Sequence, residues 1–253
     1  MLKHKVVIIS GASSGIGRAA AYACRAEQAK LVLHHIGSPQ SDKDVAQMTT
    51  EMVDSEVAFV AGDIRDPKTS SALVAAAVER FGGVDVLVSN AGICLFSDFF
   101  DVTPELLKDH MDINYAGAFS LVQACAAQMK AQGRGGSIVA ISSISALVGG
   151  GQQTHYTPTK AAILSMMQSC AVALGPYGIR CNAILPGTIQ TGMNQADLQD
   201  LRKREYMASR CALGRLGNPE DIAVPIVFLA SDMSAYMSGS QLLVDGGLFV
   251  NLQ

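Results

Sequence analysis

Tyr156 and Lys160 are the two residues whose types and spacing most directly suggest chemistry. They lie four residues apart in THYTPTKAAIL, at the expected start of a helix, because Pro158 is tolerated only in a first helical turn. Residues four apart share one helix face, so the phenol and the ammonium can meet there. A neighbouring cation favours the phenolate and lowers its pKa from about 10 towards neutrality. The pair predicts proton transfer, although the same spacing also occurs where a core tyrosine packs beside a lysine that reaches solvent.

The elements that must position this pair alternate along the whole chain. Short, mostly apolar strand patterns cover 6–10, 31–35, 57–61, 84–89, 137–142, 179–185 and 240–245, and helical patterns include 15–27, 67–81, 103–130 and 156–174. Strands that are apolar throughout are typical of a parallel sheet covered on both faces. The sequence therefore predicts an α/β fold, a Rossmann-type doubly wound parallel sheet of about seven strands with helices on both faces. Such sheets bind ligands at the carboxyl ends of their strands.

The end of the first strand carries a glycine-rich turn, SGASSGIGRAA, which opens an alanine-rich helix. Glycines allow the backbone to turn tightly and approach a pyrophosphate, whose charge is then favoured at the helix N-terminus. A glycine triplet is weak evidence alone but specific between a first strand and a helix. It predicts a dinucleotide site formed by Gly11, Ser13, Ser14, Gly15, Ile16 and Gly17.

The second strand ends in His34, His35 and, three residues later, Ser38. An NAD site usually has a carboxylate here that accepts a hydrogen bond from the ribose 2′-hydroxyl. Because no carboxylate is present to repel a 2′-phosphate, the three residues favour NADP slightly over NAD, with NAD use left open. The alternative is that these histidines are surface residues without a ligand.

Three further strand ends complete the predicted cofactor site. They contribute Asp63, Ile64, Asn90, Ala91, Gly92, Pro186, Gly187, Thr188 and Ile189, together with Tyr156 and Lys160. Asp63 is placed to bind adenine, or alternatively to cap the next helix. Asn90-Ala91-Gly92 forms a small corner beneath a ribose, or is only a turn.

Length and composition limit the classes of protein to consider. At 253 residues, without a Pro-, Gly- or Ser-rich linker, we expect a single domain over residues 1–253. No apolar run reaches the roughly 18 residues that cross a bilayer, and MLKHKVVIIS lacks the pattern of a signal peptide. We therefore expect a soluble cytoplasmic protein without a membrane partner. A formal net charge of −3 argues against nucleic acid as a partner.

The cysteines point to the same compartment. Cys24, Cys94, Cys125, Cys170, Cys181 and Cys211 are scattered, mostly within apolar runs, with no C-x-x-C pair and no histidine at metal-ligand spacing. This pattern predicts small core residues in a reducing cytoplasm, and neither a disulfide framework nor a metal site.

Taken together, these motifs make the chain similar to the short-chain dehydrogenase/reductase family over essentially its whole length. The shared motifs are G-x-x-x-G-x-G at 11–17, Asn-Ala-Gly at 90–92, Asn114 in DINYAGAF, Ser143, Tyr156-x-x-x-Lys160 and Pro186-Gly187. The resemblance implies a nicotinamide cofactor, a homotetramer and a catalytic tetrad. The tetrad consists of Asn114, Ser143, Tyr156 and Lys160. Ser10 replaces the threonine usual before the first glycine but keeps a hydroxyl.

The resemblance also implies a role for each member of the tetrad. Tyr156 exchanges a proton with the substrate, and Ser143 holds the substrate oxygen. Lys160 lowers the pKa of the phenol and anchors the nicotinamide ribose, while Asn114 holds a water that relays protons to Lys160. Taken singly, Ser143 is also consistent with a strand-end cap and Asn114 with a polar helix residue facing water.

Within the family, three segments resemble the members that oxidise the anomeric carbon of L-rhamnose to its lactone. They are SSISALVGGGQQTHYTPTK, YGIRCNAILPGTIQT and VDGGLFVNLQ. A sugar site needs several polar partners, because an unpaired buried polar group costs about 1–3 kcal/mol. The predicted substrate contacts are Ser143, Ser145, Gln153, Tyr156, Thr188 and Asn194, and residues 187–210 are predicted to form a lid with glycine hinges.

Two other functions fit the same motifs. HHIGS resembles the second-strand end of NADP-using reductases, so a 3-oxoacyl thioester reductase or a general ketoreductase is the enzymatic alternative. A cationic patch for an acyl-carrier partner would favour that alternative, and the sequence contains no strong one. A cofactor-binding regulator without catalysis is the second alternative, and the complete tetrad argues against it.

Overall fold

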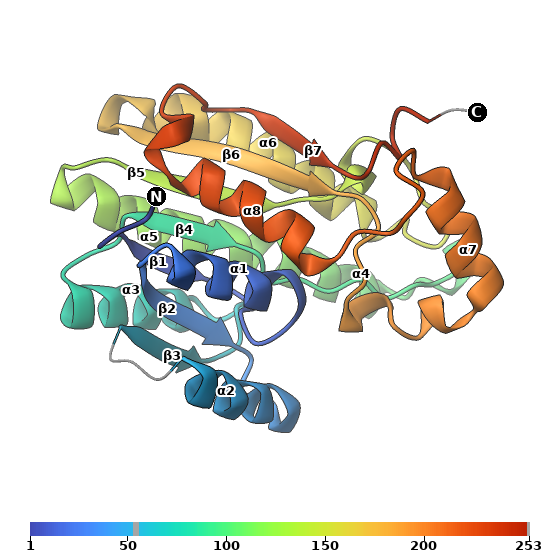
Figure 1. Cartoon of the computed structure of the whole chain (residues 1–253), viewed down its shortest axis with the longest axis horizontal. Coiled ribbons are helices and arrows are strands. Elements are labelled where there is room, and N and C mark those ends of the chain that lie inside the picture. The colour runs from blue at the N-terminus through green and yellow to red at the C-terminus, as the bar shows by residue number, and fades with distance from the viewer. Residues whose placement is uncertain (53–55, 252–253) are drawn as a thin grey trace.

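The computed structural model describes residues 1–52 and 56–251, which form one parallel sheet with helices on both faces (Figure 1). The final two residues of the C-terminal segment VDGGLFVNLQ lie outside the described part. The seven strands run in the order β3-β2-β1-β4-β5-β6-β7. They are β1 (Val6–Ile9), β2 (Lys30–His35), β3 (Val57–Ala61), β4 (Val86–Ser89), β5 (Gly136–Ile141), β6 (Ile179–Pro186) and β7 (Gln241–Val244).

Helices connect the strands and cover both faces of the sheet (Figure 1). The α-helices are α1 (Gly15–Ala26), α2 (Pro39–Glu51), α3 (Pro67–Phe81), α4 (Pro104–Met111), α5 (Ala118–Gln132), α6 (Thr157–Leu174), α7 (Leu201–Arg210) and α8 (Pro219–Ala230). Short 3₁₀ helices span Phe99–Asp101, Ile144–Ala146, Gly175–Tyr177, Gly192–Asn194, Asp197–Gln199 and Asp232–Ser234. One buried cluster joins α1 and α8 to one sheet face, and another joins α3, α5 and α6 to the opposite face.

The predicted fold class is confirmed, because strands buried on both faces form one doubly wound parallel sheet. Each predicted strand is present with ends that agree within two residues. The strand order reverses between β1 and β4, whose residues Ile8 and Leu87 pair in the register. A crevice is expected at the carboxyl ends of the strands at this switch point, and the site lies there.

The helix predicted over 103–130 is not continuous in the structure. A π-helical segment, η2 (Asp112–Gly117), lies between α4 and α5 and contains Asn114. Each π turn holds an extra residue, which rotates the following side chains relative to the preceding helix. Sequence periodicity did not reveal this, because apolar residues continue on both sides of the segment. The prediction also left out α2, which is largely polar, and α8, which contains Pro225.

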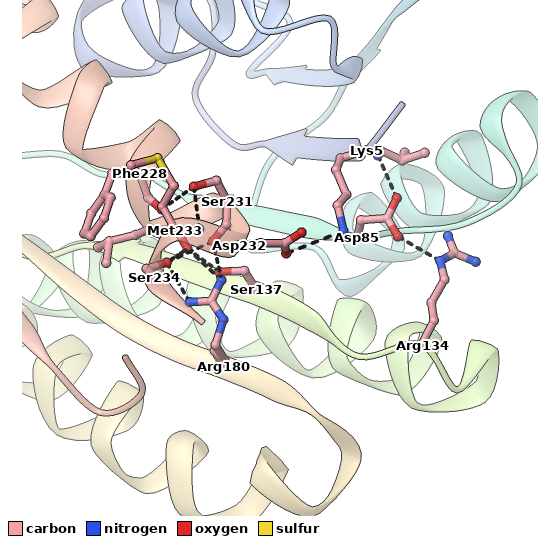
Figure 2. A network of polar contacts seen from close by, with 12 residues as sticks. Lys5, Asp85, Arg134, Ser137, Arg180, Phe228, Ser231, Asp232, Met233 and Ser234 are labelled. Carbon is pink, nitrogen blue, oxygen red and sulfur yellow. Dashed lines mark hydrogen bonds and ion pairs between the residues drawn. The ribbon is translucent and has the colours of Figure 1, made fainter. Parts of the chain in front are cut away.

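At the amino ends of the strands, Arg180 near the start of β6 binds the C-terminal end of α8 (Figure 2). Its guanidinium donates to the carbonyl oxygens of Leu229 at 3.0 Å and Ser231 at 3.1 Å, and to Ser234 Oγ at 2.9 Å. The last carbonyls of a helix have no partner inside it, so Arg180 supplies donors that α8 itself lacks. Burial lowers the pKa of the Arg180 guanidinium, which nevertheless remains charged at neutral pH.

We expect Arg180→Leu to lower the free energy of unfolding by about 2 kcal/mol, because it removes a charged donor from the Leu229 and Ser231 carbonyl oxygens, which then keep only serine hydroxyls as side-chain donors. Arg180→Lys should fall between Leu and wild type, since an ammonium keeps the charge but cannot reproduce the planar fork. Urea denaturation of the three proteins measures the difference. Equal midpoints for Leu and wild type would contradict the assigned role.

Candidate active site

The carboxyl ends of the strands surround a cavity of about 770 Å³. It is lined by most of the residues predicted from the sequence: Gly11, Ser13, Ser14, Gly15, Ile16, His34, Asp63, Ile64, Asn90, Ala91, Gly92, Ser143, Ser145, Gln153, Tyr156, Lys160, Pro186, Gly187, Thr188, Ile189 and Asn194. Four predicted residues do not line it, namely Gly17, His35, Ser38 and Asn114. The cavity thus extends from the end of β2, past the glycine-rich turn, to Tyr156.

The glycine-rich turn leaves the N-terminus of α1 free to bind an anion. Gly11 and Gly15 have φ values of +63° and +54°, a conformation that other residues rarely adopt. Ser14 is the N-cap, but its side chain makes no capping hydrogen bond, and the first turn contains no acidic residue. The backbone N–H groups in the first turn of α1 therefore remain available to bind a pyrophosphate. Gly17 instead allows close packing, because a Cβ there would lie 2.2 Å from the carbonyl oxygen of Gly11.

Ser10 and Asn90 hold the ends of β1 and β4 together beneath this turn. The Ser10 hydroxyl accepts hydrogen bonds from the backbone N–H groups of Asn90 at 2.9 Å and Ala91 at 3.0 Å. The Asn90 amide donates to the carbonyl oxygens of Ser10 at 3.0 Å and Gly11 at 3.1 Å. Asn90 therefore does more than form a turn, and the serine at position 10 supplies the hydroxyl that this junction requires.

His34 lines the far end of the cavity as a neutral ring. Its Nδ1 accepts from the Gly11 N–H at 3.1 Å, so its Nε2 carries the proton and donates to the Gly62 carbonyl at 2.9 Å. Burial lowers the pKa of His34, which keeps the ring uncharged at neutral pH. His34 consequently offers shape but no positive charge to a 2′-phosphate.

The other two residues predicted to receive a 2′-phosphate are directed elsewhere. His35 Nδ1 lies 3.4 Å from Ser41 Oγ and 3.3 Å from Asp42 Oδ1, and Ser38 caps α2. Neither lines the cavity. The sequence placed them at the end of β2 correctly, but it could not show which way their side chains point.

Arg65 is a cavity residue that the sequence reading missed. Its guanidinium forms hydrogen bonds with both carboxylate oxygens of Asp63, at 2.6–3.1 Å, and lowers the pKa of that carboxyl. Asp66, not Asp63, caps α3, so the alternative capping role for Asp63 does not hold. An arginine two residues after a predicted adenine-binding aspartate was the available signal.

Tyr156, Lys160 and Ser143 meet at the other end of the cavity. Tyr156 and Lys160 are 8% and 7% exposed, and the Lys160 ammonium lies 5.7 Å from the centre of the Tyr156 ring. Ser143 is hydrogen-bonded to the Tyr156 phenol and accepts from the Ser145 N–H at 3.0 Å. Lys160 donates to the Ile141 carbonyl at 3.0 Å. The β5 end thus fixes both partners of the tyrosine.

The pKa values of this group differ from the simplest expectation. Burial raises the pKa of the Tyr156 phenol above its ordinary value, whereas the Ser143 hydrogen bond acts to lower it. Burial also lowers the pKa of Lys160 to about 8. Burial disfavours both the phenolate of Tyr156 and the ammonium of Lys160. Its effect on the pKa of Tyr156 is therefore larger than the lowering predicted from Lys160.

Asn114 lies behind the cavity wall instead of in its lining. Its amide donates to the carbonyl oxygen of Ile93 at 2.9 Å and to Thr159 Oγ1 at 3.1 Å, and its oxygen accepts from the Ile93 N–H at 2.8 Å. A Cβ added to Gly92 would lie 3.0 Å from Asn114 Oδ1 and 3.6 Å from Lys160 Nζ, so these two side chains approach the same glycine. Asn114 is buried, which excludes the alternative that it faces water.

The substrate side of the cavity combines polar and apolar groups. Gln153 Nε2 lies 3.3 Å from Cys94 Sγ, and Asn194 bonds the backbone of Ile189 and Thr191. Asn194 therefore shapes its own turn as well as lining the cavity. Residues that the sequence reading missed here include Cys94, Phe96, Ile144, Met193 and Met207. Their apolar character gives no motif, and only the fold brings them together.

The segment predicted as a lid covers this side of the cavity. Residues 191–194, Asp197, Lys203 and Met207 line it, the last two on α7. Lys203 forms an ion pair with Asp197 and lies 5.7 Å from the centre of the Phe96 ring. These contacts connect α7 with the loop that follows β4.

The described residues contain neither a metal-binding cluster nor a helix that could span a membrane. Within 1–52 and 56–251, no cluster of three or more His, Cys, Asp or Glu side chains is placed to hold a metal ion. In the same ranges, no helix combines the length and the apolar composition needed to cross a membrane. All six cysteines are free, and four of them, Cys24, Cys125, Cys181 and Cys211, lie in buried apolar clusters, which confirms these four as core residues. Cys94 is also buried but lines the cavity, and Cys170 is partly exposed.

Comparison with known proteins agrees with this geometry. A family model described as enoyl-(acyl carrier protein) reductase matches residues 11–249. An L-rhamnose 1-dehydrogenase (NAD(P)(+)) of Azotobacter vinelandii is 58% identical, with 100% of both chains covered. An L-rhamnose-1-dehydrogenase of Scheffersomyces stipitis is 56% identical, covering 100% of this chain and 99% of the relative.

The fold also agrees with that of a solved structure. The crystal structure of a levodione reductase superposes with a TM-score of 0.92 at 31% identity and covers 99% of each chain. The match to the family model, the identity to full-length relatives and the ordered motifs around one cavity lead to the same conclusion. The chain belongs to the short-chain dehydrogenase/reductase family.

Proposed function

We propose that the protein oxidises the anomeric carbon of L-rhamnose to the lactone, using NADP or NAD. The observation that carries the proposal is the arrangement of Tyr156, Ser143 and Lys160 at one end of a cavity that also contains a free helix N-terminus. The names of relatives at 58% and 56% identity supply the sugar. The polar groups of Ser145, Gln153 and Thr188 on the cavity lining suit a polyhydroxylated substrate.

The side chains divide the reaction between them. Ser143 holds the anomeric oxygen by a hydrogen bond, and Tyr156 takes the proton of its hydroxyl as the C1–O bond becomes a carbonyl. A nicotinamide bound in the cavity would supply the acceptor for the hydride that leaves C1. Lys160 lies close enough to stabilise the phenolate, and Asn114 fixes the backbone beside Lys160. The role of Asn114 as holder of a relay water remains part of the proposal.

Residues 13–16 would hold the pyrophosphate of the cofactor by their backbone N–H groups, and Asp63 and Arg65 would lie at its adenosine end, since all of these residues line the cavity. Because Asp63 neutralises Arg65, the 2′-phosphate meets little net positive charge there. This balance supports use of both cofactors. The printed name of the Azotobacter vinelandii relative, NAD(P)(+), is consistent with it.

We expect His34→Asp to shift preference towards NAD. His34 lines the cavity, whereas the His35 side chain is directed towards Ser41 and Asp42. A carboxylate at position 34 repels a 2′-phosphate and can still accept from the Gly11 N–H. The NADP to NAD ratio of kcat/KM should fall roughly tenfold, whereas the uncharged His34→Asn should leave it near the wild-type value. An unchanged ratio in the Asp variant would mean that position 34 lies too far from the ribose to act.

A reductase of acyl thioesters is the alternative function, favoured by the description of the matching family model. The basic side chains that line the cavity are not available to bind an acidic carrier protein, which weighs against this alternative. Arg65 is paired with Asp63, Lys203 is paired with Asp197, and Lys160 is buried. The intact arrangement around Tyr156 likewise weighs against a non-catalytic regulator.

We extend the proposal to the assembly and the compartment. The chain acts as one domain over residues 1–253, with residues 187–210 closing over the substrate and excluding water. Its six free cysteines suit a reducing cytoplasm. Exposed apolar side chains, among them Phe100 at 94% exposure and Phe119, suit burial in a homotetramer. Light scattering that gives the mass of one chain would contradict that assembly.

The test is the formation of reduced nicotinamide, followed by absorbance, with L-rhamnose and a panel of other aldoses. NAD and NADP are used separately. Rapid reduction with L-rhamnose and its close epimers is the expected result. Absence of turnover with every sugar, together with oxidation of reduced cofactor by a 3-oxoacyl ester, would replace this function with the alternative.

A further inference from the structure

The wall of the cavity after β4 is formed by residues 93–97, which the surrounding protein holds by their backbone groups. Ile93, Cys94 and Phe96 line the cavity. Ile93, Leu95 and Ser97 form backbone hydrogen bonds with other segments. Asn114 binds Ile93, and the Ser97 N–H donates to the Gln152 carbonyl at 3.1 Å. These hydrogen bonds therefore fix the positions of the lining residues Cys94 and Phe96, which lie between the anchored residues.

Two buried histidines hold the middle residue, Leu95. Its N–H donates to His110 Nε2 at 3.2 Å, and its carbonyl oxygen accepts from His155 Nε2 at 2.7 Å. His110 and His155 are 0% and 1% exposed. Their rings pack edge to face, with centroids 4.4 Å apart and an interplanar angle of 89°. Both hydrogen-bonding groups of one peptide residue are thus satisfied by a single histidine pair.

The hydrogen bonds determine which nitrogen carries the proton in each ring. His110 Nδ1 donates to the Leu106 carbonyl at 2.8 Å, which leaves Nε2 as an acceptor for Leu95. Burial lowers the pKa of His110, in agreement with a neutral ring. His155 Nε2 is the donor to the Leu95 carbonyl, so Nδ1 is the acceptor nitrogen of the neutral ring.

His155 Nδ1 is buried and has no hydrogen-bond partner within the described part of the chain. An unpaired buried polar atom is unfavourable, and a leucine or methionine at this position would avoid the penalty. Packing alone therefore does not explain a histidine at this position. The hydrogen bond that His155 donates to the Leu95 carbonyl does explain it.

The two histidines also lie close in sequence to two residues of the predicted catalytic tetrad, Tyr156 and Asn114. His155 directly precedes Tyr156, and His110 lies one helical turn before Asn114, which holds Ile93. The same loop is thus fastened to the residue before the tyrosine and to the helix that presents the asparagine. A displacement of Leu95 would move the Cys94 and Phe96 side chains relative to the Tyr156 hydroxyl.

We propose that His110 and His155 are positioning residues that hold the substrate wall, residues 93–97, in register with Tyr156. The proposal rests on the proposed sugar oxidation. Neither ring lines the cavity, so neither touches the substrate, and the pair acts through the Leu95 backbone. Within the described part of the chain, the hydrogen bonds and the ring contact of the pair do not involve the cofactor turn at residues 11–17, so the affinity for the cofactor should not depend on the pair.

The experiment compares His155→Leu with His155→Gln in the complete enzyme. Glutamine places a donor near the former Nε2, whereas leucine removes it. We expect His155→Leu to raise KM for L-rhamnose about tenfold, with kcat changed less than about threefold. The dissociation constant for NADP, measured by titration without sugar, should not change. His155→Gln should restore KM to within about threefold of wild type.

The matched pair from the other ring is His110→Leu and His110→Gln. The glutamine oxygen can accept from the Leu95 N–H, so the same order of KM values is expected if His155→Leu fails to fold. An unchanged KM in the folded leucine variants would overturn the proposal. Equal losses in the Leu and Gln variants, or a parallel loss of NADP affinity, would indicate a purely structural role and would overturn it as well.

The wild-type enzyme in the same assay distinguishes a failure of the proposed sugar oxidation from a failure of the positioning role. If wild type does not oxidise L-rhamnose, the sugar assignment is wrong, and the KM comparison is made with whichever aldose or ketone wild type turns over. If wild type oxidises L-rhamnose but the leucine variants keep its KM, the assignment stands and the positioning role is wrong.

Discussion

Tyr156→Phe is expected to lower kcat for sugar oxidation by at least about 10²- to 10⁴-fold, the range typical of losing a general acid–base. The substitution removes only the hydroxyl that takes the substrate proton and bonds Ser143. The ring still fills its buried position, so the protein should fold. Cofactor affinity should persist, because the glycine-rich turn is untouched.

Steady-state rates and NADP titration test both halves of this expectation. Tyr177→Phe is the matched control, since Tyr177 is exposed and lies in a 3₁₀ turn before β6, away from the cavity. Because burial raises the pKa of Tyr156, oxidation by wild type should become faster as pH rises above neutrality. Activity retained by Tyr156→Phe would remove the proton-transfer role.

Lys160→Met is expected to abolish most activity and yet to stabilise the protein. Lys160 is buried, and its pKa falls from 10.5 to about 8, which corresponds to roughly 3 kcal/mol of unfavourable free energy for the charged form. Methionine fills a similar volume without a charge. It leaves the Ile141 carbonyl unpaired, which offsets part of the gain, so we expect a net increase of about 1–2 kcal/mol in the free energy of unfolding.

The pH dependence identifies the cause of this stabilisation. Between pH 8 and 10.5 the unfolded chain keeps the Lys160 proton while the folded chain has released it, so wild-type stability gains with rising pH in that window. Below about pH 8 both states hold the proton and the penalty is complete. The advantage of Lys160→Met should therefore be largest near pH 7 and shrink at about pH 9.5.

Urea denaturation at both pH values measures this difference. Lys130→Met is a suitable control, because Lys130 is exposed, stacks on Tyr177 and lies at the end of α5. A Lys160→Met protein that is less stable than wild type at both pH values would show that the Ile141 hydrogen bond outweighs the burial of charge.

How far the sequence predicts the fold depends on how local the signal is. The strands of a parallel sheet are apolar runs, so β1 and β6 are visible without knowledge of their neighbours. The π-helical segment around Asn114 is not visible, because a shifted hydrogen-bond register leaves the residue pattern unchanged. Helix α2 escaped prediction because it buries only Ser41 and Met48, and its polar surface resembles a loop.

The site divides in the same way. Motif residues such as Gly15, Tyr156 and Lys160 were found because their spacing along the chain is itself the signal. The directions of the His34 and His35 side chains depend on atoms from other segments. The same is true of the pKa of Tyr156, on which burial has a larger effect than charge. The contact between His110 and His155 joins residues with no fixed sequence relationship, so only the folded structure reveals it.

The Ser10 hydroxyl bonds to a backbone group 80 residues further along the chain, and this has a consequence for biosynthesis. A growing chain can form β1, β2 and β3 early, but the junction beneath the glycine-rich turn must wait until β4 has left the ribosome. At about 5–20 residues per second the delay is roughly 4–16 s. During that time the apolar edge of β1 lacks its partner, so the nascent chain depends on rapid translation or on chaperones to avoid aggregation.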